Sequence, residues 1–266
     1  MLRPYQSTIK SEIYSRWASG PKNILAVMPC GAGKTVVMAD IFKDRGNRVA
    51  IAVAHRQELV GQISLALARS GLHHRIIAPS STIRFIVDRH FKTLRRHFHD
   101  PNASLAVAGI DTLIRRTGEL SAFLNQVRLW QTDEAHHLLA SNKWGRGVEA
   151  MPNAIGVGWT ATPARADHKP LGRDHGGVFD ELVCGPTMRE LIDQGHLCDY
   201  TLYGPPGDME LSRVAVSAST GDFNPNQLRD AAHKSHITGD IVAHYLRWAA
   251  GKRGITFAVD VELGAE

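Results

Sequence analysis

Residues 28 to 35 read Met28-Pro29-Cys30-Gly31-Ala32-Gly33-Lys34-Thr35, a glycine-rich segment between two patterns of regular structure. The short apolar run from Asn23 to Met28 predicts a buried strand, and the pattern from about Lys34 to Asp44 predicts a helix. Glycine allows successive backbone N–H groups to point inward, and the N-terminus of a helix behind them favours an anion. We therefore expect a strand, a phosphate-binding turn and a helix in this order.

Strands and helices continue to alternate beyond this segment. A helical pattern runs from Leu59 to about Gly71. Further strands are predicted at Arg48–Ala54, Ser104–Ala108, Val127–Thr132 and Ala154–Trp159. This spacing is typical of parallel βαβ units. The predicted fold class is therefore α/β, with a mostly parallel central sheet flanked by helices.

Lys34 and Thr35 give the glycine-rich segment its chemistry. The Lys34 ammonium can reach the β- and γ-phosphates of a nucleotide, and the Thr35 hydroxyl can ligate Mg²⁺. The general phosphate-loop pattern begins with glycine, where this chain has Met28. The residues predicted to bind ATP here are Pro29, Cys30, Gly31, Ala32, Gly33, Lys34 and Thr35. The alternative interpretation is a glycine-rich turn with a surface lysine.

A second segment, Leu129-Trp130-Gln131-Thr132-Asp133-Glu134-Ala135-His136, places two carboxylates directly after an apolar strand. In open α/β sheets, ligands bind at the carboxyl ends of the strands. Asp133 is predicted to hold Mg²⁺, and Glu134 to orient or deprotonate the attacking water. The alternative is an acidic helix cap. A metal site at His136-His137 is not expected, because adjacent histidines should project apart.

Together the two segments predict a P-loop NTPase, and three further motifs narrow the class. The sequence resembles superfamily-two helicases with a DEAH box. The matching motifs are Leu2 to Gln6, the P-loop, Ala54-His55-Arg56-Gln57-Glu58-Leu59, Asp133-Glu134-Ala135-His136 and Thr160-Ala161-Thr162. Phage and prophage helicases are the most similar, through Asn142-Lys143-Trp144-Gly145, Trp159 to Pro163 and Phe179 to Pro186.

This resemblance implies a RecA-like fold, ATP and Mg²⁺ as cofactors, and roles for further residues. It implies that Arg3 and Gln6 recognise the adenine. His136, Thr160 and Thr162 would couple hydrolysis to movement between two lobes. His55, Arg56 and Thr112 fall in motifs that contact the nucleic-acid backbone, although this chain has Asp111 where the family usually has Gln. In the alternative, Thr112 caps a helix and Arg56 is a solvated charge.

The composition is that of an ordinary globular protein without a membrane span. The 266 residues carry a net charge of +5, which suits a polyanionic partner but also many plain enzymes. No apolar run approaches the roughly 18 residues of a membrane helix, and no signal sequence is evident. The three cysteines form no Cys-x-x-Cys pair. These features predict a cytoplasmic protein with nucleic acid as partner and no membrane association.

One basic segment allows two interpretations. An apolar stripe there, flanked by arginines and a lysine, consists of Ile83, Val87, Phe91, Leu94 and Phe98. We predict a surface helix that packs this stripe on the sheet. The alternative is a basic amphipathic helix that lies along nucleic acid or a membrane surface.

The predicted domains are a RecA-like ATP-binding domain at residues 1–203, a linker at 204–236 and the start of a second RecA-like lobe at 237–266. In that third part, a helix and then a strand at Ile255–Val261 are expected. No Gln-x-x-Gly-Arg-x-x-Arg type segment, which would carry an arginine finger, occurs in the sequence. We expect either a fragment of a longer helicase or a truncated prophage product.

The function predicted from these features is that of the ATP-binding lobe of an ATP-dependent DNA helicase or translocase. Loss of an arginine finger costs on the order of 10³ to 10⁵ in rate, so this chain should bind ATP better than it hydrolyses it. DNA is favoured over RNA through the resemblance. Two alternatives remain: a nucleotide-gated DNA-binding module without useful catalysis, and the motor part of a restriction-type complex whose partner supplies the second lobe.

Overall fold

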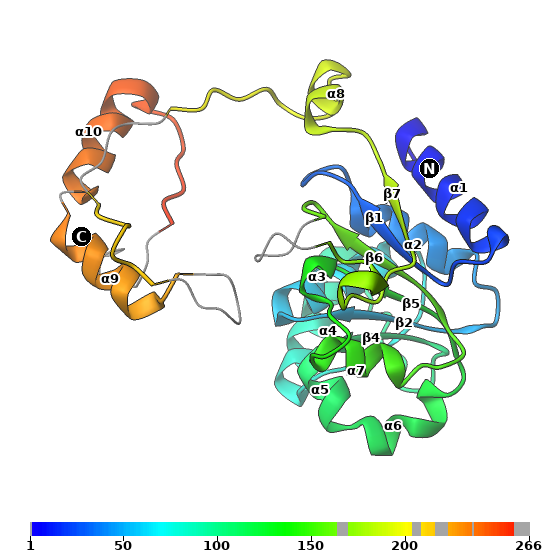
Figure 1. The fold of residues 1–266 in the computed structure, drawn as a ribbon. Coiled ribbons are helices and arrows are strands. Elements are labelled where there is room, and N and C mark those ends of the chain that lie inside the picture. The colour runs from blue at the N-terminus through cyan, green and yellow to red at the C-terminus, as the bar shows by residue number, and fades with distance from the viewer. Residues whose placement is uncertain (1, 164–169, 204–208, 216–222, 236, 258–266) are drawn as a thin grey trace. The chain divides into compact units, whose positions relative to one another are not determined.

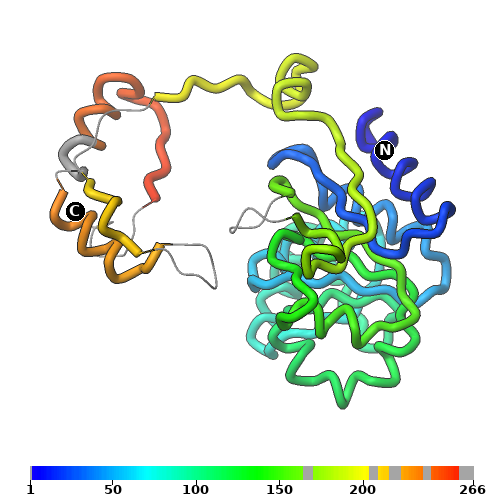
Figure 2. The backbone as a smooth tube through the Cα atoms, in the orientation of Figure 1, coloured from blue at the N-terminus to red at the C-terminus, as the bar shows by residue number. Residues whose placement is uncertain are grey.

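The computed structural model of the chain describes residues 2–163, 170–203, 209–215, 223–235 and 237–257. The chain divides into two compact units, Met1–Cys198 and Asp199–Glu266. The first unit contains the sheet and every motif singled out in the sequence, and its path can be followed in Figure 2.

A seven-stranded sheet forms the centre of the first unit, and its strands all pair in parallel (Figure 1). The strands are β1 (Asn23–Val27), β2 (Val49–Ala54), β3 (Arg75–Ile77), β4 (Leu105–Gly109), β5 (Val127–Thr132), β6 (Ile155–Thr160) and β7 (Glu181–Cys184). Their order is β3-β4-β2-β5-β6-β1-β7, so β6 separates β1 from β5. The predicted α/β fold with a parallel central sheet is confirmed.

Helices connect the strands and cover both faces of the sheet (Figure 1). In the first unit they are α1 (Pro4–Ser19), α2 (Lys34–Lys43), α3 (Gln57–Arg69), α4 (Ser80–Leu94), α5 (Ile110–Arg115), α6 (Thr117–Leu124), α7 (Lys143–Glu149) and α8 (Met188–Asp193). Two short 3₁₀ helices, η1 (Ala135–His137) and η2 (Arg173–His175), lie in loops.

Two apolar clusters form the core, one on each face of the sheet. Along β2, Ala50 and Ala52 belong to one cluster, whereas Ile51 and Val53 belong to the other, as expected for side chains that alternate along a strand. Helices α1 to α4 pack into the first cluster, and α5 to α7 pack into the second. Both faces of the sheet are therefore covered, which explains why its strands are nearly continuous apolar runs.

Glycines in β6 make room for two large aromatic side chains. A Cβ atom at Gly156 would lie 1.9 Å from the ring of Trp130 on β5, and one at Gly158 would lie 2.3 Å from the ring of Phe179. Both rings are buried in the second apolar cluster. A Cβ atom at Gly158 would also lie 2.7 Å from Ala135 Cβ, so this glycine makes room for the loop after β5 as well.

A buried chain of polar side chains links α3, β3 and α4. Ser64 Oγ lies 2.6 Å from His74 Nε2 and 3.1 Å from His90 Nε2. His74 Nδ1 lies 2.9 Å from the Leu72 carbonyl, and the Phe98 N–H donates to His90 Nδ1 over 3.4 Å. All four bonds form at once only when both histidines are neutral: His90 donates to Ser64, Ser64 to His74, and His74 to Leu72.

The predicted apolar stripe on α4 is confirmed only in part. Ile83 packs against the core and Phe98 is buried, whereas Phe91 is 47% exposed. The fully buried residues of the helix are Thr82, Ile86 and His90. Burial of His90 is favourable because Ser64 and the Phe98 backbone satisfy its ring nitrogens. The helix therefore packs on the sheet, as expected, but with a partly polar face.

The predicted strands and helices of the first unit agree with the structure to within one or two residues at most ends. Strands β3 and β7 were not predicted, since they contain only 3 and 4 residues. Both lie at the edges of the sheet, where a short strand gains hydrogen bonds from one neighbour only.

The second unit contains helices α9 (Pro225–Lys234) and α10 (Ile237–Ala249). Helix α9 falls within the predicted linker at 204–236, of which residues 204–208, 216–222 and 236 lie outside the described residues. Residues 255–257, where a buried strand was predicted, are not in a strand, and Ile255 and Phe257 are 85% and 92% exposed. The remainder of that predicted strand, 258–261, lies outside the described residues. Among the described helices, none is long and apolar enough to span a membrane.

Candidate functional site

The carboxyl ends of four central strands carry the predicted site residues. Lys34 follows β1, His55 follows β2, Asp133 follows β5 and Thr160 ends β6. Because these strands are parallel neighbours in the sheet, their following loops meet at one edge. The P-loop is held to β6 there, since the Met28 N–H donates to the Thr160 carbonyl over 3.0 Å.

The P-loop has the backbone that its glycines predict. Gly31 and Gly33 have φ angles of +78° and +84°, in the left-handed region that side chains disfavour. Gly33 is the N-cap of α2, and its carbonyl accepts from the N–H groups of Val36 and Val37. The N-terminus of a ten-residue helix therefore stands behind the loop, which is the arrangement that favours a phosphate group.

The Lys34 side chain extends over the P-loop. Its Nζ donates to the carbonyls of Met28 and Pro29 over 3.3 and 3.5 Å. Both partners are neutral and belong to the loop itself, so a phosphate oxygen would be a stronger partner for the ammonium group. Thr35 follows in the first turn of α2, where its half-buried side chain lies next to Lys34 in the chain.

Helix α1 is fastened to the P-loop through Gln6 and Tyr5. Gln6 Nε2 and Tyr5 Oη both donate to the Ala32 carbonyl, over 2.9 and 3.1 Å. The N–H of Arg3 donates to Gln6 Oε1 over 2.9 Å, and Arg3 Nη1 donates to Tyr5 Oη over 3.3 Å. The two residues predicted to recognise adenine, Arg3 and Gln6, therefore lie beside the P-loop.

Asp133 and Glu134 form a closely spaced acidic pair after β5. The N–H of Glu134 donates to Asp133 Oδ1 over 3.0 Å. Burial raises the pKa of Asp133; that hydrogen bond opposes the rise, and the charge of Glu134 adds to it. A divalent cation at this carboxylate would offset the same effects. The Asp133 carboxylate therefore fits the Mg²⁺ that the motif implies.

Glu134 is one of two described non-glycine residues with a positive φ angle, +53°. This left-handed conformation ends β5 abruptly and begins the 3₁₀ helix at Ala135. Strained conformations of this kind often mark functional sites. Glu134 occupies the N-cap position of this 3₁₀ helix, as the helix-cap alternative expects, but its side chain makes no capping hydrogen bond.

His136 joins the acidic pair to the end of β6. Its Nδ1 lies 3.4 Å from Glu134 Oε2 and 3.2 Å from Thr160 Oγ1. Thr160 Oγ1 in turn donates to the carbonyl of Thr162 over 2.9 Å and accepts from its N–H over 3.1 Å. The three residues predicted to couple hydrolysis to movement are therefore in one continuous hydrogen-bonded chain.

His55 and Arg56 line a pocket of about 410 Å³ together with Glu134, His136 and His137. Arg56 is exposed and forms the N-cap of α3. The rings of His55 and His137 are 5.3 Å apart. Burial lowers the pKa of both histidines; nearby positive charge, from Arg56 at His55 and from His136 at His137, lowers it further. Two of the predicted nucleic-acid contacts thus share a pocket with Glu134.

The prediction that His136 and His137 project apart is wrong. Their ring centroids lie only 4.1 Å apart at the end of the 3₁₀ helix Ala135–His137. No group of three or more His, Cys, Asp or Glu side chains suited to a metal occurs among the residues that the structure describes.

Thr112 lies away from this pocket. It is only 9% exposed, within α5 rather than at its start. The N-cap of α5 is Gly109, so the alternative that Thr112 caps the helix is also wrong. The neighbouring Asp111 pairs with Lys143 over 2.7 Å. An exposed acidic residue and a buried hydroxyl are a poor surface for a phosphate backbone.

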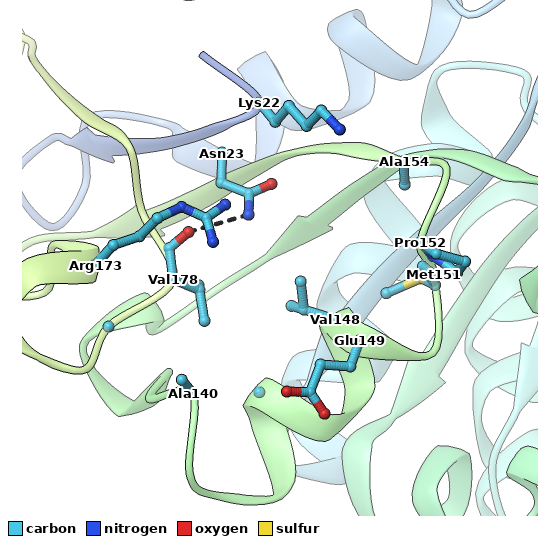
Figure 3. A pocket seen from close by; sticks show the side chains of 12 residues that line it. Lys22, Asn23, Ala140, Val148, Glu149, Met151, Pro152, Ala154, Arg173 and Val178 are labelled. Carbon is cyan, nitrogen blue, oxygen red and sulfur yellow. Dashed lines mark hydrogen bonds between the residues drawn. The ribbon is translucent and has the colours of Figure 1, made fainter.

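A separate cavity of about 270 Å³ lies at the opposite, amino-terminal edge of the sheet (Figure 3). Asn23, the first residue of β1, and Ala154, which precedes β6, line it, and Asn23 Nδ2 donates to the Val178 carbonyl over 3.0 Å. None of the residues predicted to bind nucleotide or nucleic acid lines this cavity. The predicted site residues therefore lie outside this cavity.

The parallel α/β fold and the order of these motifs are matched by a known protein family. A family model described as "Type III restriction enzyme, res subunit" matches residues 1–165, and the chain belongs to this family. A 51.5 kDa protein of a Lactococcus phage (isolate 7-9) is 27% identical over 237 residues, which are 88% of this chain and 43% of the phage protein. The chain thus spans less than half the length of that relative.

Solved structures show the same fold at low sequence identity. The type ISP restriction-modification enzyme LlaGI, solved as a nuclease-deletion mutant with a DNA substrate mimic, has a TM-score of 0.52 and 16% identity, covering 74% of this chain and 21% of LlaGI. The helicase domain of Pyrococcus furiosus Hef has a TM-score of 0.49 and 20% identity, covering 69% of this chain and 37% of the Hef chain. The UvsW helicase of bacteriophage T4 has a TM-score of 0.49 and 16% identity, covering 68% of this chain and 59% of the UvsW chain. The predicted resemblance is supported by the family match and by the similarity to a phage protein.

Sequence reasoning missed Tyr5, His137 and His196 at this edge. Tyr5 lies between Arg3 and Gln6, within a motif already singled out, so its position in the first turn of α1 could have indicated it. His196 carries no sequence signal, because only the packing of α8 brings it to Tyr5, at a ring distance of 5.2 Å.

Proposed function

We propose that this chain is the ATP-binding lobe of an ATP-dependent DNA helicase or translocase. The observation that carries the proposal is the convergence of the P-loop, the acidic pair and Thr160 at one sheet edge, where Met28 and Thr160 are hydrogen-bonded. Membership of the res-subunit family supports it.

In this proposal each residue at the carboxyl edge of the sheet has a separate role. The P-loop backbone and Lys34 hold the phosphates, and Arg3 and Gln6 lie on the side of the base. Thr35 and Asp133 hold Mg²⁺, which neutralises phosphate charge when bound. Glu134 orients the attacking water and accepts its proton. The carboxylate is positioned by His136, whose Nδ1 lies 3.4 Å from Glu134 Oε2.

Nucleic acid is proposed to bind along the loop after β2. The exposed Arg56 and the half-buried His55 lie on the same pocket as Glu134, which would connect the two ligands. Sequence-independent binding of a phosphate backbone needs positive and hydrogen-bonding groups of this kind. We propose DNA rather than RNA, supported by the DNA substrate mimic in the LlaGI structure. Thr112 is the weakest member of the predicted set because it is buried.

A second candidate function is favoured by the family match alone. The family is described by the res subunit of type III restriction enzymes, so the chain would be the motor part of a restriction-type complex. In either case an arginine from a second lobe, in the same or a partner chain, is proposed to complete hydrolysis. The two candidates share the nucleotide site and differ in the partner, which co-purification with a larger subunit would identify.

Binding of Mg-ATP to the chain and to Lys34→Ala, measured by calorimetry, tests the proposal. The variant should bind about 10- to 100-fold more weakly, because hydrogen bonds to charged groups contribute about 1.5–3 kcal/mol. Lys43→Ala is the matched control, since Lys43 is an exposed residue in the last turn of the same helix. Equal affinity in Lys34→Ala and Lys43→Ala would contradict the P-loop assignment.

A further inference from the structure

The segment after α8 returns to the P-loop in a fixed conformation. Thr187 and Glu190 form a capping box at the start of α8, and the chain turns at Gly195, where φ is +71°. The N–H groups of His196 and Leu197 then both donate to the Leu191 carbonyl, over 2.8 and 3.1 Å. Leu191 is fully buried, so the two residues that follow the turn are anchored to the core.

Leu197 and His196 contact two different parts of the nucleotide site. A Cβ atom at Gly31 would lie 2.9 Å from Leu197 Cδ2, so Leu197 packs directly against the P-loop. The ring of His196 lies 5.2 Å from the ring of Tyr5, tilted by 48°. His196 is half-buried and therefore keeps part of its surface accessible.

Tyr5 is itself held in place at the P-loop by a hydrogen bond. Its hydroxyl donates to the Ala32 carbonyl over 3.1 Å, beside the Gln6 amide that donates to the same oxygen over 2.9 Å. The other end of Gln6 accepts from the Arg3 N–H. Gln6 is thus engaged at both ends, and the Tyr5 and His196 rings, tilted by 48°, lie next to it on that side of the loop.

We propose that His196, together with Tyr5, binds the base of the nucleotide by stacking, and that α8 is therefore part of the nucleotide site. This inference rests on the proposed function and adds a base-binding residue from an element outside the motifs. A planar base gains affinity from an aromatic face irrespective of its hydrogen-bonding groups. Phosphate binding, by contrast, depends on Lys34 and the P-loop backbone.

The test separates the base from the phosphates. Binding of Mg-ATP and of magnesium tripolyphosphate, which has no base, is measured by calorimetry for the parent chain, His196→Ala and His196→Phe. His196→Ala should bind ATP roughly 5- to 150-fold more weakly, the effect expected from one stacked base, and should bind tripolyphosphate like the parent. His196→Phe should restore ATP affinity because it keeps an aromatic face.

His73→Ala is the matched control. It removes a histidine whose ring lies 5.0 Å from Phe98 at a tilt of 44°, nearly the same geometry, beside β3 at the far edge of the sheet. Parent-like ATP binding in His196→Ala would overturn the inference, and so would an equal loss for ATP and tripolyphosphate, since that outcome indicates a structural role. If neither ligand binds the parent, or if Lys34→Ala binds both like the parent, the proposed function fails and the inference with it.

Discussion

His136 Nδ1 and Thr160 Oγ1 are 3.2 Å apart, and the surroundings of Thr160 fix which atom donates. The Thr160 hydroxyl already donates its proton to the Thr162 carbonyl, so toward His136 it is an acceptor. His136 must then carry its proton on Nδ1, and the same N–H faces Glu134 Oε2 at 3.4 Å. One proton of His136 is therefore shared between the end of β6 and the proposed catalytic carboxylate.

Replacement of the Thr160 hydroxyl by a methyl group should remove its hydrogen bonds to both His136 and Thr162. Thr160→Val leaves the Thr162 N–H and the His136 N–H without their acceptor, and we expect a loss of about 1–3 kcal/mol in the free energy of unfolding. Thr160→Ser should lose less than half of that. Urea unfolding measures the difference, and ¹⁵N NMR of the parent should show His136 protonated at Nδ1. A parent protonated at Nε2 would contradict the assigned donor.

Glu134→Gln should separate binding from hydrolysis. The amide keeps the shape of the carboxylate but cannot accept a proton, so Mg-ATP affinity should stay within about threefold of the parent. Single-turnover hydrolysis, measured with DNA present, should fall by roughly 10²- to 10⁴-fold. Glu149→Gln, on α7, is the control and should hydrolyse ATP like the parent. Unchanged hydrolysis in Glu134→Gln would show that this residue is not the base.

Acid should destabilise the fold through the buried histidines. Burial lowers the pKa of His74 to about 4 and also lowers the pKa of His90. Since the unfolded chain has a histidine pKa of about 6.5, stability is full above that pH and falls as the pH drops toward 4. His74 alone accounts for a loss of about 3 kcal/mol, because one pKa unit corresponds to about 1.4 kcal/mol.

Urea unfolding at several pH values between 7.5 and 4.5 measures this loss. In His74→Leu the slope of stability against pH should become shallower, although the variant is less stable because Ser64 loses a partner. His73→Leu, at the exposed neighbouring position, should keep the slope of the parent. A parent whose stability stays constant over this range would contradict neutral histidines in the Ser64 chain.

A methyl group at Gly156 should be among the most damaging changes in the core. The new Cβ would lie 1.9 Å from the ring of Trp130, which is 1% exposed and has no room to move away. We expect Gly156→Ala to lose about 3 kcal/mol or more. Gly118→Ala in α6 is the control, because nothing lies within 4 Å of its Cβ and helix propensity favours alanine. Thermal unfolding of both variants checks the prediction.

The sequence was sufficient to predict the interior strands of the sheet and the loops that carry the motifs. Strand β2 is a continuous apolar run, β5 carries the apolar pair Leu129 and Trp130, and Asp133 and Glu134 follow β5 directly. Edge strands β3 and β7 were missed because 3 or 4 residues show no periodicity.

The hydrophobic periodicity of the sequence could not predict contacts between polar side chains that are far apart in the chain. His90 is a polar residue that is buried in the structure. Its partners Ser64 and Phe98 lie 26 and 8 residues away in the chain, so helical periodicity does not reveal them. Periodicity therefore assigned the buried face of α4 to Phe91, which is largely exposed. His196 was not predicted as a site residue for the same reason, because its proximity to Tyr5 depends on how α8 packs.

The position of β6 between β1 and β5 has a consequence for the proposed reaction. Adjacent strands lie about 4.8 Å apart, so the loops that carry Lys34 and Asp133 start from strands roughly 10 Å apart. Were β1 and β5 neighbours, the ammonium and the carboxylate could meet in a direct ion pair and neutralise each other. The interposed strand instead acts as a spacer, which keeps the two opposite charges available for the phosphate chain and for the cation between them.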